Sequence, residues 1–187
     1  MSALLQAVFS GVCGQNPDHM WMPGGWVLPC CQRCVGLYAG AAFAVALQIL
    51  VRPRPTGRFL KCHGLFLAQM VPFGFHWVSQ GAVLRTVTGY LFGYGLIAFL
   101  WLQARQVFGL SYSSRAGRLW RYYLTLGFGL MTVVALALWG GRFGALVLIA
   151  WVMIGALALA VLAGANLALG LGTLGRWLLR TGLGGLR

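Results

Sequence analysis

The chain has 187 residues, of which 60% are hydrophobic and only 8% are charged, whereas soluble domains carry about 25% charged residues. Its 14 lysines and arginines stand against a single acidic residue, Asp18, which excludes paired-carboxylate catalysis, carboxylate sites for Mg²⁺ or Ca²⁺, and proton relays built on acidic side chains. The composition predicts an all-α, polytopic transmembrane helix bundle in contact with a lipid bilayer, and it leaves too little aqueous surface for nucleic acid.

Taken in chain order, residues 3–12 are apolar but too short to span a membrane, and they lack the charged start of a signal peptide. We expect a short interfacial or re-entrant segment there. Five later stretches approach the 20 or so apolar residues that a span needs. They are Val35–Val51, Phe59–Val78, Leu84–Leu102, Trp120–Trp139 and Phe143–Leu169.

The chain therefore divides into a cysteine-containing, outward-facing N-terminal segment (1–34), a five-helix bundle (35–170) and a basic tail (171–187). In the tail, Arg176 and Arg180 flank Trp177, which is typical of an amphipathic segment at the membrane interface. An aromatic belt near the span ends is indicated by six tryptophans, Trp21, Trp26, Trp77, Trp120, Trp139 and Trp177.

The basic residues are unevenly divided between the two sides of the predicted bundle. One side has three, Arg33, Arg85 and Arg142. The other has 11: Arg52, Arg54, Arg58, Lys61, Arg105, Arg115, Arg118, Arg121, Arg176, Arg180 and Arg187. Because cytoplasmic loops carry the excess of basic residues, we expect the N-terminus outside and the C-terminus in the cytoplasm, in a prokaryotic inner membrane.

Two GxxxG spacings occur on predicted spans, Gly36/Gly40 and Gly89/Gly93. Small residues at this spacing let helix backbones approach closely. We interpret them as packing faces within the bundle. A face for a partner subunit is the alternative.

Four of the five cysteines fall in the first 34 residues, and Cys31 and Cys34 form a CxxC motif at the start of the first span. Such a pair is typical of zinc ligands, a thiol redox pair or a disulfide. Cys13 supplies a third thiol, and a tetrahedral metal site needs a fourth ligand. We expect His76, near the outer end of the second span, to supply it. Cys30 and His19 are less favoured.

His63 and His76 lie 13 residues apart, about 20 Å along a helix, so they cannot ligate one haem together. Two arginines on the sparsely charged outer side, Arg33 and Arg85, are candidates for a lipid headgroup or anion contact. Ordinary interfacial arginines that reach toward the headgroups are the plainer interpretation.

Several of these residues resemble the signature of a family of small membrane proteins known as domain of unknown function 2085. The resemblance rests on Cys13-Gly-Gln-Asn-Pro17, on the stretch from Gly25 through Pro29-Cys-Cys-Gln-Arg-Cys34 to Gly40, and on two later blocks. The later blocks are residues 72–80 and Leu84-Arg-Thr-Val-Thr-Gly89. The resemblance covers roughly residues 13–93, and it implies a membrane fold and a site without implying a reaction.

The chain departs from the family signature at three positions that bear on the site. Gly14 stands where the family has histidine, His19 where it has arginine, and His76 where it has aspartate. Losing one nitrogen ligand at 14 and gaining one at 76 implies a fourth ligand that has moved to His76.

Three functions fit these observations. The first is an accessory or assembly subunit of a larger membrane complex, with a structural metal site, most simply one zinc ion, and membrane protein partners. The second is a membrane thiol–disulfide redox protein using Cys31 and Cys34. The third is a lipid or small-solute carrier, for which few polar residues are available within the spans.

Overall fold

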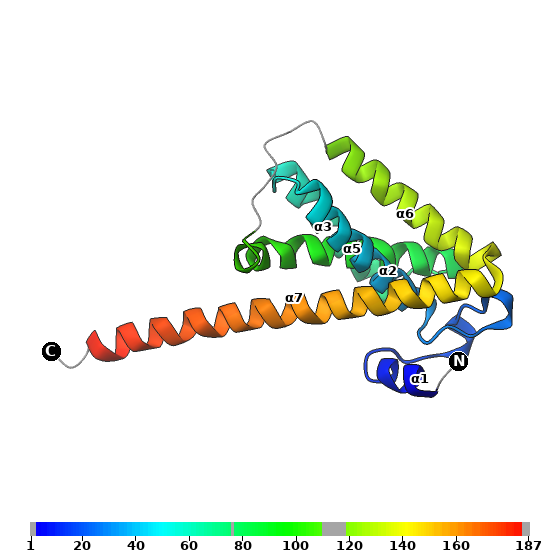
Figure 1. The fold of residues 1–187 in the computed structure, drawn as a ribbon, viewed down its shortest axis with the longest axis horizontal. Helices are drawn as coiled ribbons and strands as arrows, with labels where there is room; N and C mark the ends of the chain where they lie inside the picture. The colour runs from blue at the N-terminus through cyan, green and yellow to red at the C-terminus, as the bar shows by residue number, and fades with distance from the viewer. Residues whose placement is uncertain (1–2, 76, 110–118, 185–187) are drawn as a thin grey trace.

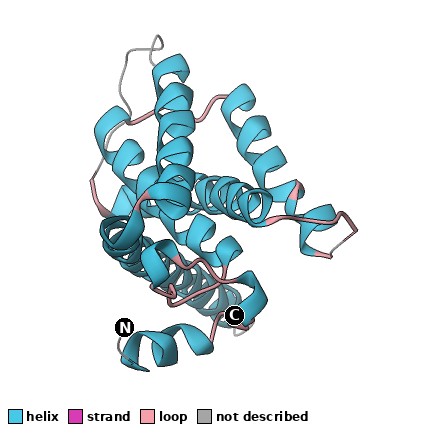
Figure 2. Ribbon diagram, turned by 90° about the vertical axis from the view of Figure 1, so that its right-hand side faces the viewer, coloured by secondary structure: helices cyan, strands magenta, loops and turns pink. Residues whose placement is uncertain are grey.

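A computed structural model describes residues 3–75, 77–109 and 119–184 of the chain, and over these residues it contains helices and loops but no β-strand (Figures 1 and 2). The all-α prediction is therefore confirmed. The elements are α1 (Ala3–Ser10), the short 3₁₀ helices η1 (Pro17–His19) and η2 (Pro23–Gly25), α2 (Gln32–Val51), α3 (Gly57–Ala68), α4 (Met70–Gly74), α5 (Ala82–Val107), α6 (Leu119–Trp139) and α7 (Gly141–Gly184).

Four helices among the described residues, α2, α5, α6 and α7, are long and apolar enough to cross a membrane. They correspond to four of the five predicted spans. The remaining one, Phe59–Val78, is not a single helix, because the chain breaks between α3 and α4. Pro72 explains the break: its ring clashes with the carbonyl four residues earlier, on Ala68, and it has no N–H to donate. Ala68 is the last residue of α3.

The two glycine faces pack directly on each other. A Cβ placed on Gly36 or Gly40 would collide with the α5 backbone at Thr86 or Tyr90, and one placed on Gly89 or Gly93 would collide with the α2 backbone. The prediction of packing faces within the bundle is confirmed. Gly89 meets Arg33 and Gly93 meets Leu37, so residue numbers rise together and the two helices run parallel.

Parallel packing of α2 and α5 requires the chain between them to return to the starting end of the bundle. The return is made by α3 and α4, which run antiparallel to α5: the His63 carbonyl is close to Gly95, and the Gln69 side-chain amide donates to the Thr88 carbonyl (2.9 Å). Over the described residues, four passes through the bundle are made by long helices, and the pass between α2 and α5 is made by the broken α3–α4 segment.

The two ends of the bundle differ in charge. Arg33 and Arg85 lie in the first turns of the parallel helices α2 and α5, and the backbone of Arg142 packs against Gly24 in the N-terminal segment. Arg52 and Arg105 lie at the opposite ends of these two helices. Three of the predicted cytoplasmic arginines, Arg115, Arg118 and Arg187, lie outside the described residues.

The last helix, α7, is 44 residues long and extends well beyond the other helices toward the C-terminus (Figure 1). Its first half is held in the bundle by close contact of Gly155 with the Tyr38 backbone, and Asn166 donates to the Leu100 carbonyl of α5 (2.9 Å). The predicted boundary at residue 170 is not a break in the helix. Placement of the tail at the membrane interface stays a prediction.

Candidate metal centre

The N-terminal segment folds back over the beginnings of α2 and α5. Trp21 is buried, and its indole N–H donates to the Thr86 hydroxyl (2.9 Å), which in turn donates to the Gln32 carbonyl (3.2 Å). An isolated antiparallel bridge joins Met20 to Cys31. These contacts fix the loop that carries Cys13 above the first turn of α2.

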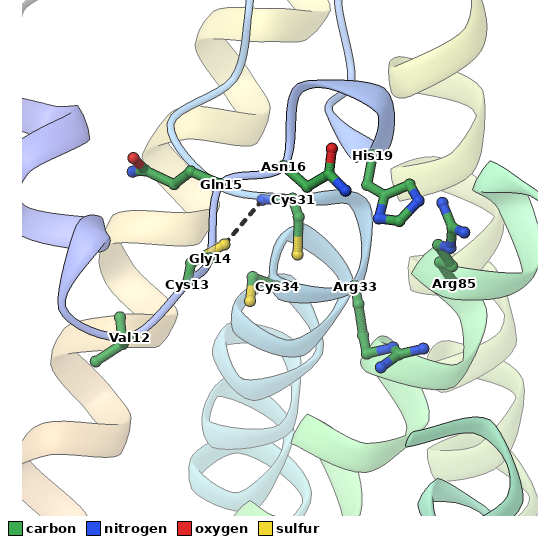
Figure 3. A pocket seen from close by; sticks show the side chains of 10 residues that line it. All are labelled: Val12, Cys13, Gly14, Gln15, Asn16, His19, Cys31, Arg33, Cys34 and Arg85. Atoms are coloured by element: carbon green, nitrogen blue, oxygen red, sulfur yellow. Dashed lines mark hydrogen bonds between the residues drawn. The ribbon is translucent and has the colours of Figure 1, made fainter. Parts of the chain in front are cut away.

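Three sulfur atoms meet where this loop crosses the helix. The Sγ atoms of Cys13, Cys31 and Cys34 all lie within 4.8 Å of one another (Figure 3). Cys31 is the N-cap residue of α2 and Cys34 lies in its first turn, so the CxxC spacing places both thiols on the same helix end. The geometry positions these three residues to hold a metal ion.

Backbone donors and the helix terminus favour negative charge at this position. The backbone N–H of Cys31 donates to the Cys13 sulfur at 3.2 Å, and the unpaired N–H groups at a helix N-terminus stabilise anions. A hydrogen bond from the Cys34 thiol, together with further hydrogen bonds, lowers the pKa of Cys31 from 9.0 to about 5 despite partial burial. The lowered pKa favours the thiolate of Cys31, which is the form that binds metals and attacks disulfides.

Cys30 differs from its neighbour. It is fully buried and is not a member of the sulfur group, and burial raises its thiol pKa because the charged form loses its hydration. The geometry favours Cys31 over Cys30 as a ligand. His19 lines the same cavity as Cys31 and Cys34 but does not belong to the close group, and His76 lies outside the described residues.

The three sulfurs open onto a cavity of about 270 Å³ that is also lined by Arg33 and Arg85. In Figure 3 the Arg33 guanidinium points away from the sulfurs, while that of Arg85 lies on the side of His19. Arg33 donates to the Phe73 carbonyl (2.9 Å) and to the Gln80 side chain (3.1 Å). It therefore ties the end of the broken α3–α4 segment to the start of α2.

A second polar cluster, which no sequence pattern predicted, lies toward the other end of the bundle. The imidazole of His63 is completely buried and lies against Tyr94 and Tyr122. Its Nδ1 is 2.8 Å from the Phe59 carbonyl and its Nε2 is 3.3 Å from the Tyr122 hydroxyl, which also accepts from Gln48 (3.4 Å). No local spacing signals this cluster, because His63, Tyr94, Tyr122 and Gln48 lie on four different helices.

Two polar side chains on the spans each donate one hydrogen bond to a carbonyl of their own segment and one to a carbonyl of α5. Gln69 donates to the carbonyls of Phe66 and Thr88, and Asn166 donates to those of Leu100 and Leu162. Such bonds join neighbouring helices.

The fold and the site together define a helical membrane protein that carries a three-thiol cluster at one end of its bundle. Residues 13–99 match the model of a family described as a predicted membrane protein, DUF2085. The match begins at Cys13 and includes the three clustered cysteines, so the resemblance seen in the motifs is confirmed over these residues. No curated protein and no solved structure matches the chain.

Proposed function

We propose that Cys13, Cys31 and Cys34 bind one metal ion, most simply zinc, as a structural centre. The convergence of three sulfurs from two separate segments within 4.8 Å carries this proposal. Thiolates are the preferred ligands of structural zinc, and such sites are closed by a fourth ligand. His76 is our candidate for that ligand. His19, which lines the same cavity as the three cysteines, is the alternative.

The metal would fasten the Cys13 loop to α2. Two of the three ligands belong to the first turn of this helix and the third to the segment that crosses over it. Because a ligand set of this kind does not exist in the unfolded chain, metal binding contributes directly to the folding free energy. Removal of the metal is therefore expected to loosen the N-terminal segment before the helices.

Metal analysis of the purified full-length protein tests the site. We expect one equivalent of zinc in the wild type, and a large loss in each of Cys13→Ser, Cys31→Ser and Cys34→Ser. Cys62→Ser is the matched control, since Cys62 lies on α3 and outside the sulfur group. Retention of a full equivalent by Cys31→Ser, or a wild type that holds far less than one, contradicts the proposal. His76→Ala and His19→Ala identify the fourth ligand.

We further propose that the protein acts as an accessory or assembly subunit of a membrane complex in a prokaryotic inner membrane, with the metal centre on the outer side. The hydrogen bonds of Gln69 and Asn166 to carbonyls of α5 join segments within the bundle, and that supports a structural role. A native pull-down in mild detergent should recover a stoichiometric membrane protein partner. Recovery of lipid alone contradicts the proposed role as a subunit of a complex and does not affect the proposal of a metal site.

A thiol–disulfide exchange role is the second candidate, because the lowered pKa of Cys31 is what an attacking thiol needs. In this scheme the Cys31 thiolate attacks a disulfide of an outer-side protein and releases one of its thiols. Cys34 then displaces the second thiol, leaving a Cys31–Cys34 disulfide. Counting alkylated thiols before and after mild reduction discriminates the structural metal centre from the redox role, since a metal centre keeps Cys31 and Cys34 reduced.

A further inference from the structure

An apolar groove lies at the end of the bundle opposite the cysteines. It encloses about 410 Å³ and is lined by nine side chains from α2, α5 and α7, all of them apolar. Trp101 and Leu162 form its floor, with 7% and 3% of their surface exposed. Phe108 and Leu157, on its walls, are exposed. The volume is in the range of ligand sites, and the exposed walls show that the groove opens outward.

Positive charge lies at one end of this groove. Arg52 ends α2, and its Nε donates to the carbonyl of Ile49, which lines the groove (3.2 Å). On α5, Arg105 lies four residues after Trp101 and so shares a helix face with it, and Phe108 follows just beyond the end of this helix. The single acidic side chain of the sequence, Asp18, lies in η1, at the cysteine end of the bundle.

These features suit an amphiphile with one alkyl chain in the groove and an anionic head at the arginines. The predicted orientation places this end at the cytoplasmic leaflet, where anionic lipids are concentrated and attract basic residues near the membrane.

We propose that the groove binds one acyl chain of an anionic phospholipid whose phosphate group lies against Arg52 and Arg105. The site is separate from the metal centre, at the other end of α2 and α5. It neither requires the metal nor depends on the function proposed for it.

Fluorescence quenching tests the proposal on the full-length protein in nanodiscs. Phosphatidylglycerol or phosphatidylcholine with brominated acyl chains is added as a minor component. The signal of Trp101 is taken as the difference between the wild type and Trp101→Phe. We expect stronger quenching by the brominated anionic lipid, and a loss of about fivefold in that preference in Arg52→Gln. Because Arg52 is exposed, this variant leaves the packing intact.

Filling the groove provides a second, independent measurement. Ala158→Phe places a ring in the groove and should abolish quenching of Trp101 by either lipid, whereas Ala160→Phe, on the exposed side of α7, should leave it unchanged. Equal quenching by the two lipids, or a preference that Arg52→Gln does not reduce, overturns the proposal. So does a Trp101 that neither lipid quenches in the wild type, since the groove then takes up no acyl chain from the added lipid.

Discussion

Replacing Gly36 by alanine tests how tightly α2 and α5 are held together. The new Cβ would lie 2.8 Å from the backbone nitrogen of Tyr90 and 2.9 Å from the carbonyl carbon of Thr86, and closer still to the Thr86 oxygen. Non-bonded carbons normally sit about 3.5–4.0 Å apart, so the backbones must separate by roughly 1 Å. Overpacking of this kind costs about 1–3 kcal/mol, and the better helix propensity of alanine offsets up to about 1 kcal/mol. We expect a net loss of about 1–2 kcal/mol.

Reversible unfolding in mixed detergent micelles, followed by far-UV circular dichroism, measures this free energy of unfolding. Gly127→Ala on α6 is the matched control, because nothing lies within 4 Å of its Cβ position. There the propensity gain acts alone and should stabilise the protein by about 0.5–1 kcal/mol. If Gly36→Ala were as stable as Gly127→Ala, the two helices would separate without cost and the packing argument would be refuted.

Three further predictions concern single side chains. Tyr122→Phe removes the hydroxyl that meets His63 and should lower the free energy of unfolding by about 1–3 kcal/mol, because the imidazole Nε2 is left buried without a partner. A loss below about 0.5 kcal/mol in the same unfolding assay would show that this bond contributes little. Trp21→Phe removes the bond to Thr86, and we expect faster proteolysis of the N-terminal segment than of the bundle. Simultaneous cleavage of both would contradict this. In metal-free protein, alkylation of Cys31 should rise through a midpoint near pH 5, since its thiolate forms there and not near 9.0. A midpoint near 9.0 would show that Cys34 does not stabilise the thiolate.

Hydropathy located the long helices well because a bilayer-spanning segment must be both long and continuous. The predicted Val35–Val51 corresponds to Gln32–Val51, and Trp120–Trp139 corresponds to Leu119–Trp139. The prediction of Phe59–Val78 as one continuous helix was wrong for a local reason. Its apolar run is long enough, but hydropathy does not register the steric effect of Pro72 on the preceding turn.

The cysteine site was predictable in part because the CxxC spacing is local, so Cys31 and Cys34 belong on one helix turn wherever that helix lies. Bringing Cys13 to them depends on contacts across the fold, such as that of Trp21 with Thr86, which no local pattern contains. The His63 cluster was missed for the same reason. Its members come from four helices, and each helix contributes only one or two of them.

The parallel contact between α2 and α5 also has a consequence for biosynthesis. Gly36 meets Thr86, which follows it by 50 residues, and the broken α3–α4 segment lies between them. A ribosome adds about 5–20 residues per second, so roughly 3–10 s pass between synthesis of the glycine face of α2 and synthesis of the α5 backbone that packs on it. During that interval its closely spaced glycines face lipid or the insertion machinery. The tightest helix pair of this protein therefore cannot form as the first hairpin enters the membrane, and it must assemble after a third segment has been inserted.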